Sequence, residues 1–366
     1  MIKQHHIQSL ATLQLVAILT VVIGHYAVTD NAFLNSVGVS FCFVYSGFFT
    51  ALRHEFGPSY GLRDHLGFLR GKLARFYPLH VLALLLCALS YYLLDFRVPT
   101  KLLNAKVLLA HLTLTSPWFA TPSYYFGLNA VAWFLCDLFF LYLAAPWMVR
   151  GLRLLRPFWQ VCLVVLLAAL QLAGGYADVF TPYQLYQFPP MRLLDFGTGV
   201  VLCNVSRTDR WQELARQLTP RRATVVEVAA LVVSLLLYPL CEKYLHGHCY
   251  RAYCASAPIV TVMLGTMVLT VDGNGVISRM LRRNPLAALS DLGAEMYLLQ
   301  LATFFLLERH LARWGVTQYH MVHLLLQLAL LLAVSWLVHR LYTAPLARRL
   351  TKPVCSPGND CGKGTP

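Results

Sequence analysis

A histidine at the end of the first long apolar stretch is the residue best suited to acid–base chemistry. His25 follows the run LVAILTVVIG, which places it late in an apolar helix. An imidazole has an ordinary pKa of about 6.5, so it can take a proton from a hydroxyl group and return it to a leaving group. The sequence leaves a second interpretation open, in which His25 is a packing residue bonded to a neighbouring carbonyl.

Gln14 and Asp137 are two further polar side chains within apolar stretches. Gln14 lies eleven residues before His25, about three helical turns, so the two side chains share one helix face. Asp137 follows Trp133 by one turn in AWFLCDLFF. Ionisable groups inside a membrane usually face a bundle interior or a wet cavity, because lipid solvates them poorly. Asp137 could therefore orient the imidazole or form a structural ion pair with an arginine.

Three basic residues lie close together in FLRGKLARFYP, just before the third apolar stretch: Arg70, Lys72 and Arg75. The planar fork of arginine suits phosphate groups, so this segment could hold a nucleotide-bearing ligand. Anchoring to anionic lipid headgroups is the alternative. In either case the segment is predicted to meet phosphate.

Other polar residues in apolar stretches either line a cavity or serve helix packing. Ser46 and Gly47 in FCFVYSGFF are small enough to let two helices approach closely. Arg192 and Asp195 in PPMRLLDFGTG are three apart and can meet on one helical face. The stretch LGAEMYLLQ carries three more polar groups: Glu295, Tyr297 and Gln300.

The elements that must position these side chains are membrane helices, because the composition excludes a soluble enzyme. Of 366 residues, 58% are hydrophobic and 13% charged, and the mean hydropathy is +0.57; an ordinary soluble protein has roughly 25% charged residues. We expect an all-α integral membrane protein with a single bundle of about ten transmembrane helices. The predicted spans are 9–28, 34–52, 77–95, 128–149, 157–174, 190–204, 223–241, 256–271, 286–308 and 320–344.

The formal net charge of +14 is explained by membrane topology. With the N-terminus in the cytoplasm, the inside loops carry roughly three times as many Lys and Arg residues as the outside loops, as the positive-inside rule expects. We predict cytoplasmic termini, a multi-pass location in the inner or plasma membrane, membrane lipid as a partner, and no nucleic-acid partner. Residues 1–350 are expected to form one domain and 351–366 a disordered cytoplasmic tail.

A cysteine cluster falls in a predicted outside loop. Cys249 and Cys254, or Cys241 with either, could form a disulfide there, or all could be free thiols. His246 and His248 lie nearby, but the spacing matches no standard zinc pattern. We therefore expect no metal.

Taken together and in order, these segments resemble the membrane-bound acyltransferase family called acyltransferase 3. The similarity runs from about residue 7 to 350. It rests on the run ending in His25 and on six further segments: FVYSGFF at 43–49, RGKLARFYP at 70–78, AWFL with Tyr142 and Pro146, RLLDFGTG at 192–199, LGAEMYLLQ at 292–300, and SWLVHRLYTAPLARRL at 335–350.

The resemblance implies an enzyme that takes an acyl group, usually acetyl from acetyl-CoA, and delivers it to a glycan hydroxyl. The family's essential histidine corresponds to His25, and its arginine pair to Arg70 or Lys72 with Arg75. Its arginine at the sixth span corresponds to Arg192. The implied fold is a ten-helix bundle with a donor pocket open to the cytoplasm.

Four positions depart from the family pattern. Gln14 stands where members usually carry Arg or Lys, and Leu138 stands where many carry glutamate. Gln300 replaces a common histidine, and the acid before the tenth-span proline is absent at Thr343 and Ala344. These departures keep open the alternative of an inactive family member.

The mechanism expected from the resemblance places acetyl-CoA on the cytoplasmic side and a lipid-linked or polymeric sugar on the outside. His25 would be a general base or a transient acyl carrier. The donor is expected to contact Arg70, Lys72, Arg75 and Gln14. The acceptor is expected to contact Ser46, Trp133, Arg192, Asp195, Tyr297 and Gln300. Sugar rings could also stack on Trp118, Tyr124 and Tyr125, for which interfacial anchoring is the alternative.

A transporter or flippase of a polysaccharide precursor is the alternative from another class. Buried polar groups in a multi-span bundle are common to both. No repeat relates the two halves of the sequence, and the ordered motifs match the acyltransferase family, so the enzyme is favoured.

Overall fold

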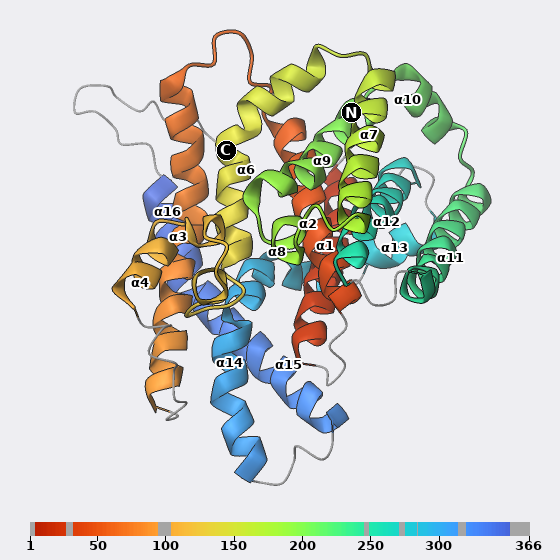
Figure 1. Cartoon of the computed structure of the whole chain (residues 1–366). Helices are drawn as coiled ribbons and strands as arrows, with labels where there is room; N and C mark the ends of the chain where they lie inside the picture. The colour runs from red at the N-terminus through yellow and green to blue at the C-terminus, as the bar shows by residue number, and fades with distance from the viewer. Residues whose placement is uncertain are drawn as a thin grey trace, which may run out of the picture.

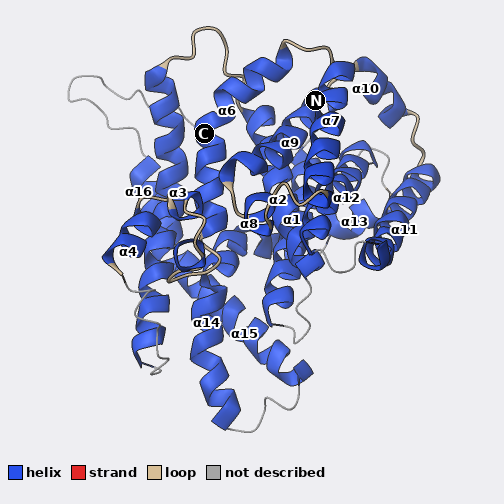
Figure 2. Cartoon of the chain, viewed as in Figure 1, coloured by secondary structure: helices blue, strands red, loops and turns tan. Residues whose placement is uncertain are grey.

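The computed structural model describes residues 4–26, 32–93, 104–244, 249–270, 275–283, 285–313 and 320–351. Over these residues all regular secondary structure is helical, joined by loops and turns, with no strand (Figure 2). The predicted all-α class is therefore confirmed. The predicted tail, 351–366, lies outside the described residues apart from Thr351.

The helices run along a common bundle direction, with α1 and α2 at the centre, α3 at one edge and α11 at the other (Figure 1). Short 3-10 segments cover Ser116–Trp118, Pro189–Arg192 and Pro285–Leu292, and a π-helical turn covers His339–Thr343. The α-helices are α1 (Gln4–Tyr26), α2 (Ala32–Arg53), α3 (Leu62–Leu93), α4 (Ala105–Leu112), α5 (Pro122–Tyr125), α6 (Trp133–Arg153), α7 (Pro157–Tyr176), α8 (Pro182–Tyr186), α9 (Leu193–Ser206), α10 (Asp209–Arg216), α11 (Pro220–Tyr244), α12 (Cys249–Thr270), α13 (Val276–Arg283), α14 (Gly293–Arg313), α15 (His320–Val338) and α16 (Ala344–Thr351).

Six helical segments among the described residues are long and apolar enough to cross a membrane. They are Gln8–Tyr26, Asn35–Arg53, Leu62–Ser90, Trp133–Arg153, Pro157–Tyr176 and Met321–Leu350. The other four predicted spans are also helical and correspond to α9, α11, α12 and α14.

The fourth and ninth predicted spans begin as α-helix five or more residues later than expected. The fourth span was expected from residue 128, but α6 begins at Trp133, because Leu128 adopts a left-handed φ of 53° and Asn129 donates its side-chain N–H to the carbonyl of Leu298 at 2.9 Å. The ninth span was expected from residue 286, but α14 begins at Gly293 after the 3-10 segment. Both α6 and α14 are therefore shorter at their N-terminal ends than the predicted spans.

The centre of the bundle depends on close contact between α2 and α9. A methyl group at Gly47 would lie 2.0 Å from the carbonyl oxygen of Phe196, and one at Gly199 would lie 1.9 Å from that of Val44. Only glycine lets the two backbones approach so closely, a use of small residues that is common where membrane helices pack. Gly47 therefore serves packing, whereas its neighbour Ser46 lines a cavity.

Candidate active site

A cavity of about 340 Å³ lies among α1, α2, α3, α6 and the start of α14, and we call it the basic cavity. Its polar lining includes two basic residues predicted from the sequence, Lys72 and Arg75, together with Gln14 and Ser46. Arg70, predicted beside them, is exposed and does not line this cavity. The side chains that complete its lining are Ala11, Ile18, Cys42, Tyr45, Phe49, Thr50, Arg53, His54, Phe76, Phe134, Leu135, Leu138, Tyr142, Ser290, Asp291, Gly293, Ala294, Tyr297 and Leu298.

Aromatic rings hold the cationic groups of the basic cavity in place. The Lys72 ammonium lies 4.2 Å from the ring centre of Tyr142, and the Arg53 guanidinium lies 5.0 Å from that of Phe49. An aromatic ring adds no charge of its own, so the stacking does not neutralise these cations. With Arg53, Lys72 and Arg75 against Asp291, the single acid among the described lining residues, the lining is net basic and offers donors for charge-assisted hydrogen bonds to phosphate.

Arg53 and His54 of the basic cavity were missed by the sequence analysis. Arg53 ends α2 and His54 begins the loop that follows, and arginines of α6 bind the backbone of that loop. Arg150 donates to the carbonyls of Phe56, at 2.6 Å, and of Gly57 and Tyr60. Arg153 donates to the carbonyl of Glu55 at 2.6 Å. In the sequence these arginines signalled only topology, because nothing local indicates which carbonyls they reach.

His54 differs from the other polar groups of the basic cavity because it is half-buried among cations. Burial lowers its pKa below the ordinary value, and the positive charges of Lys72 and Arg53 lower it further. The imidazole is therefore neutral at pH 7, and a bound anion would favour its protonated form.

A second cavity, of about 470 Å³, contains His25, and we call it the His25 cavity. Its lining is aromatic and amide-rich and includes no Lys, Arg, Asp or Glu among the described residues. The lining residues are His25, Asn35, Val39, Phe126, Ala130, Val131, Trp133, Tyr186, Gln187, Tyr297 and Leu301. Trp133 and Tyr297 thus lie with His25 as predicted acceptor contacts, whereas Ser46 belongs to the other cavity.

Gln300 fixes the orientation of the His25 imidazole. The side-chain N–H of Gln300 donates to the carbonyl of Tyr297 at 2.8 Å, which turns its amide oxygen toward His25. That oxygen lies 3.0 Å from Nδ1 of His25. Because an amide oxygen can only accept, Nδ1 is assigned the proton and Nε2 is the basic nitrogen. The side chain that departs from the family pattern is thus the one that positions the histidine.

The two buried aspartates, Asp137 and Asp195, differ in their hydrogen bonds. Asp195 accepts from Arg192 at 2.7 Å and from Ser40 at 3.4 Å. Asp137 is fully buried, and neither carboxylate oxygen has a hydrogen-bond partner within the described part of the chain. Nδ1 of His25 thus has Gln300 of α14 as its hydrogen-bond partner, and the role predicted for Asp137 stays a prediction.

Arg192 holds the entry to α9. Its Nε donates to the carbonyl of Tyr186 at 2.9 Å, and its guanidinium lies 4.9 Å from the Tyr186 ring centre. With Asp195 it forms the ion pair expected from their spacing. Neither residue lines either cavity. Through the contacts of Arg192 they instead support Tyr186, which lines the His25 cavity.

The missing acid near the last predicted span has a structural explanation. Thr343 donates its hydroxyl to a carboxylate oxygen of Glu295 at 2.5 Å, and His339 lies 2.9 Å from the same oxygen. Glu295 is buried. A carboxylate at position 343 would face that of Glu295 and repel it, so threonine suits this contact.

Two predicted features fall outside what the structure describes. The side chains of Cys241, Cys249 and Cys254 are outside the described side chains, as are those of His246 and His248. The disulfide therefore stays a prediction.

The fold and the two cavities define a class, an all-helical membrane protein with a basic cavity next to an imidazole. Residues 7–340 match the family described as acyltransferase domain, and the chain belongs to this family. The resemblance indicated by the sequence motifs is thus confirmed. The acyltransferase MdmB of Streptomyces mycarofaciens is 28% identical over 199 residues, which cover 49% of this chain and 49% of that protein. The chain thus matches about half the length of this curated relative. No solved structure matches the chain.

Proposed function

We propose that the protein is a multi-pass membrane O-acyltransferase that moves an acetyl group from acetyl-CoA to a sugar hydroxyl of a surface glycan or exopolysaccharide. The observation that supports this most directly is the meeting of two unlike cavities beside an oriented histidine. The basic cavity suits an anionic donor, and the His25 cavity suits an uncharged acceptor. The family membership supports acyl transfer as the reaction.

The donor binds in the basic cavity. Coenzyme A carries several phosphates, and Arg53, Lys72 and Arg75 offer charge-assisted hydrogen bonds to them. The thioester end extends toward Phe134 and Tyr297, the apolar end of the same cavity. Gln14, which replaces the usual basic residue, lines this cavity as a neutral group and offers amide hydrogen bonds.

The acceptor binds in the His25 cavity. Trp133 and Tyr186, with ring centres 4.9 Å apart, offer apolar faces for a sugar ring, and Asn35 and Gln187 offer amide groups for its hydroxyls. Among the described residues of this lining, no cation is available to pair with a carboxylate or phosphate on the reacting ring. The proposed acceptor ring is therefore neutral, on a lipid-linked or polymeric glycan.

His25 performs the proton transfer. Its Nε2 takes the proton of the acceptor hydroxyl as that oxygen attacks the acyl carbon, and returns it to the departing thiolate. We place the basic cavity on the cytoplasmic side, with ten crossings and both termini inside, in the inner or plasma membrane. This orientation lets the cytoplasmic donor and an outer acceptor reach one histidine from opposite sides.

The test compares wild type, His25→Ala and His323→Ala in a host deleted for this gene. His323 is the matched control, because it is a half-buried membrane histidine that also lies next to a glutamine, 3.2 Å from the side-chain nitrogen of Gln327, and lines neither cavity. O-acetyl groups on the surface glycan are measured by NMR, and protein level by immunoblot. Wild type and His323→Ala are expected to restore acetylation and His25→Ala to lose it by about 10²- to 10⁴-fold.

Two results would contradict the proposal. If the glycan is acetylated equally in the deletion strain and in the complemented strain, this glycan is excluded as the acceptor. If the purified wild type does not bind acetyl-CoA, acetyl-CoA is excluded as the acyl donor. A solute-transport assay in vesicles would then test the transporter alternative.

A further inference from the structure

One tyrosine separates the two cavities. Tyr297 lines both the basic cavity and the His25 cavity. The consecutive α6 residues Trp133 and Phe134 divide between them, since Trp133 lines only the His25 cavity and Phe134 only the basic cavity. The ring centres of Phe134 and Tyr297 lie 4.8 Å apart. An aromatic partition therefore stands where donor and acceptor must meet.

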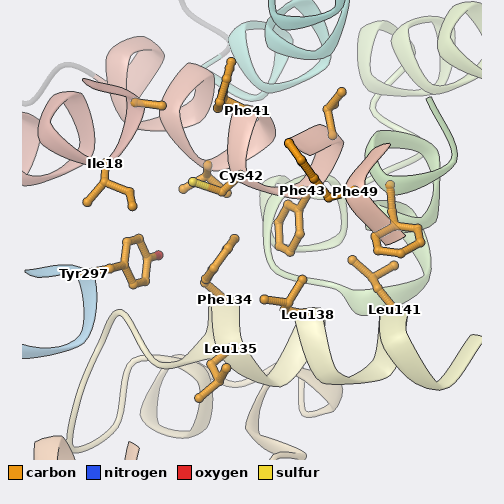
Figure 3. Close-up of a cluster of buried hydrophobic side chains, with 14 of the residues drawn as sticks. Ile18, Phe41, Cys42, Phe43, Phe49, Phe134, Leu135, Leu138, Leu141 and Tyr297 are labelled. Carbon is orange, nitrogen blue, oxygen red and sulfur yellow. The ribbon is translucent and has the colours of Figure 1, made fainter. Parts of the chain in front are cut away.

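The phenol hydroxyl of Tyr297 faces into this partition. It points from α14 toward Cys42 of α2 and Phe134 of α6 (Figure 3). Tyr297 is buried, with 4% of its surface exposed. A polar O–H in such a place is well suited to bind a polar atom of a ligand that spans the two cavities.

Tyr297 is also connected to His25, the proposed base, through Gln300. Gln300, one turn later on α14, donates to the backbone carbonyl of Tyr297 and orients Nδ1 of His25. Residues three apart lie on the same face of a helix. One turn of α14 thus carries both the phenol and the group that orients the imidazole.

We propose that Tyr297 donates a hydrogen bond to the carbonyl oxygen of the acyl group during transfer, and that its ring keeps water of the His25 cavity from the thioester. This inference rests on the proposed function. In the reaction the acceptor oxygen forms a bond to the acyl carbon, its proton passes to Nε2 of His25, and negative charge develops on the carbonyl oxygen. The carbon–sulfur bond then breaks and the thiolate takes the proton from the imidazolium. A fixed donor at the developing oxyanion accelerates such a step because it needs no reorganisation.

The test uses Tyr297→Phe, Tyr297→Ala and the matched control Tyr183→Phe. Tyr183 is half-buried and also comes from the aromatic part of the bundle; it donates its hydroxyl to the carbonyl of Pro117, but it lines neither cavity. Two rates are measured: the gain of O-acetyl on the surface glycan of the deletion host after induction, and the release of CoA from acetyl-CoA by purified protein in detergent without acceptor. Acetyl-CoA binding to each purified variant is measured as well.

The two substitutions separate the two roles. Tyr297→Phe keeps the partition and removes the donor, so glycan acetylation is expected to slow about 10²- to 10³-fold, while acetyl-CoA binding and acceptor-free CoA release stay at the wild-type level. Tyr297→Ala opens the partition, so acceptor-free CoA release is expected to rise above wild type. Tyr183→Phe is expected to match wild type in all three measurements.

The outcomes also distinguish this inference from the proposed function. If wild type acetylates and His25→Ala does not, but Tyr297→Phe acetylates at the wild-type rate, the oxyanion role is overturned and the proposed function stands. If Tyr297→Ala binds acetyl-CoA without faster CoA release, the water-excluding role is overturned. If wild type neither binds acetyl-CoA nor acetylates, both the function and this inference fall.

Discussion

Gln300 offers the sharpest test of how the histidine is oriented. Replacing it by leucine keeps a similar volume but removes the acceptor that lies 3.0 Å from Nδ1 of His25. The hydrogen bond that selects the tautomer with the basic Nε2 is then lost. Gln300→Leu is therefore expected to lower kcat and to leave KM for the acyl donor unchanged, since Gln300 does not line the basic cavity.

The size of the effect follows from the single bond that is lost. A neutral hydrogen bond contributes about 0.5–1.5 kcal/mol net, which at 25 °C corresponds to about a 2- to 13-fold loss of correctly oriented imidazole. Removing the base itself costs about 10²- to 10⁴-fold. Gln300→Leu is thus expected to fall between wild type and His25→Ala. Gln300→Glu keeps an acceptor for Nδ1 but loses the N–H that Gln300 donates to the Tyr297 carbonyl, so it is expected to be more active than Gln300→Leu and less active than wild type.

The assay is the rate of CoA release from acetyl-CoA by the purified protein with saturating acceptor, read with a thiol-reactive dye. The matched control is Gln327→Leu, which removes another buried glutamine that contacts a histidine away from both cavities. Our reasoning about the tautomer is refuted if Gln300→Leu has the wild-type kcat. It is equally refuted if Gln300→Leu is as slow as His25→Ala while Gln327→Leu is normal and all proteins elute as folded particles.

Three further predictions concern the donor site, the core and helix α4. Lys72→Gln is expected to raise KM for acetyl-CoA about 10- to 100-fold through loss of a charge-assisted bond, whereas Arg70→Gln, which is exposed outside the cavity, should stay within about twofold in the same steady-state assay. Gly199→Ala is expected to destabilise the protein by about 1–3 kcal/mol or more, because the added methyl overlaps the Val44 carbonyl, and a normal thermal unfolding temperature in detergent would contradict this. Burial lowers the pKa of His111 to about 4, and nearby His80 adds to the shift. The unfolded chain therefore binds more protons than the folded protein between pH 4 and 6.5, and the free energy of unfolding should fall by roughly 2 kcal/mol from pH 7.5 to pH 5. His111→Gln should reduce this loss in the same unfolding experiment.

The sequence was sufficient to predict the helices, the all-helical membrane class and the protein family. Long apolar runs with few charges can satisfy their backbone only as helices in a membrane, so the all-helical class could be predicted from composition alone. The order of short motifs from His25 to the segment 335–350 was enough to indicate the acyltransferase family. Helix starts were less certain, because the start of α6 depends on Asn129 bonding to Leu298, far away in the chain.

The sequence could not assign the candidate residues to sites. Gln14 and His25 share a face of α1, yet they line different cavities, because α2 and α14 close around them at different heights. Ser46, predicted to meet the acceptor, lies with Lys72 in the basic cavity instead. Arg53 had no motif to mark it, and its position depends on arginines of α6 that hold the adjoining loop.

The sequence by itself thus determined that this chain forms apolar helices, that it carries a histidine able to exchange protons, and that its family transfers acyl groups. Only the tertiary structure decided that Gln300 orients His25, a contact between residues 275 positions apart, and that Tyr297 stands between the two cavities. The physical reason is that helical periodicity fixes which side chains share a face, whereas the neighbour that each face meets is set by the packing of distant helices.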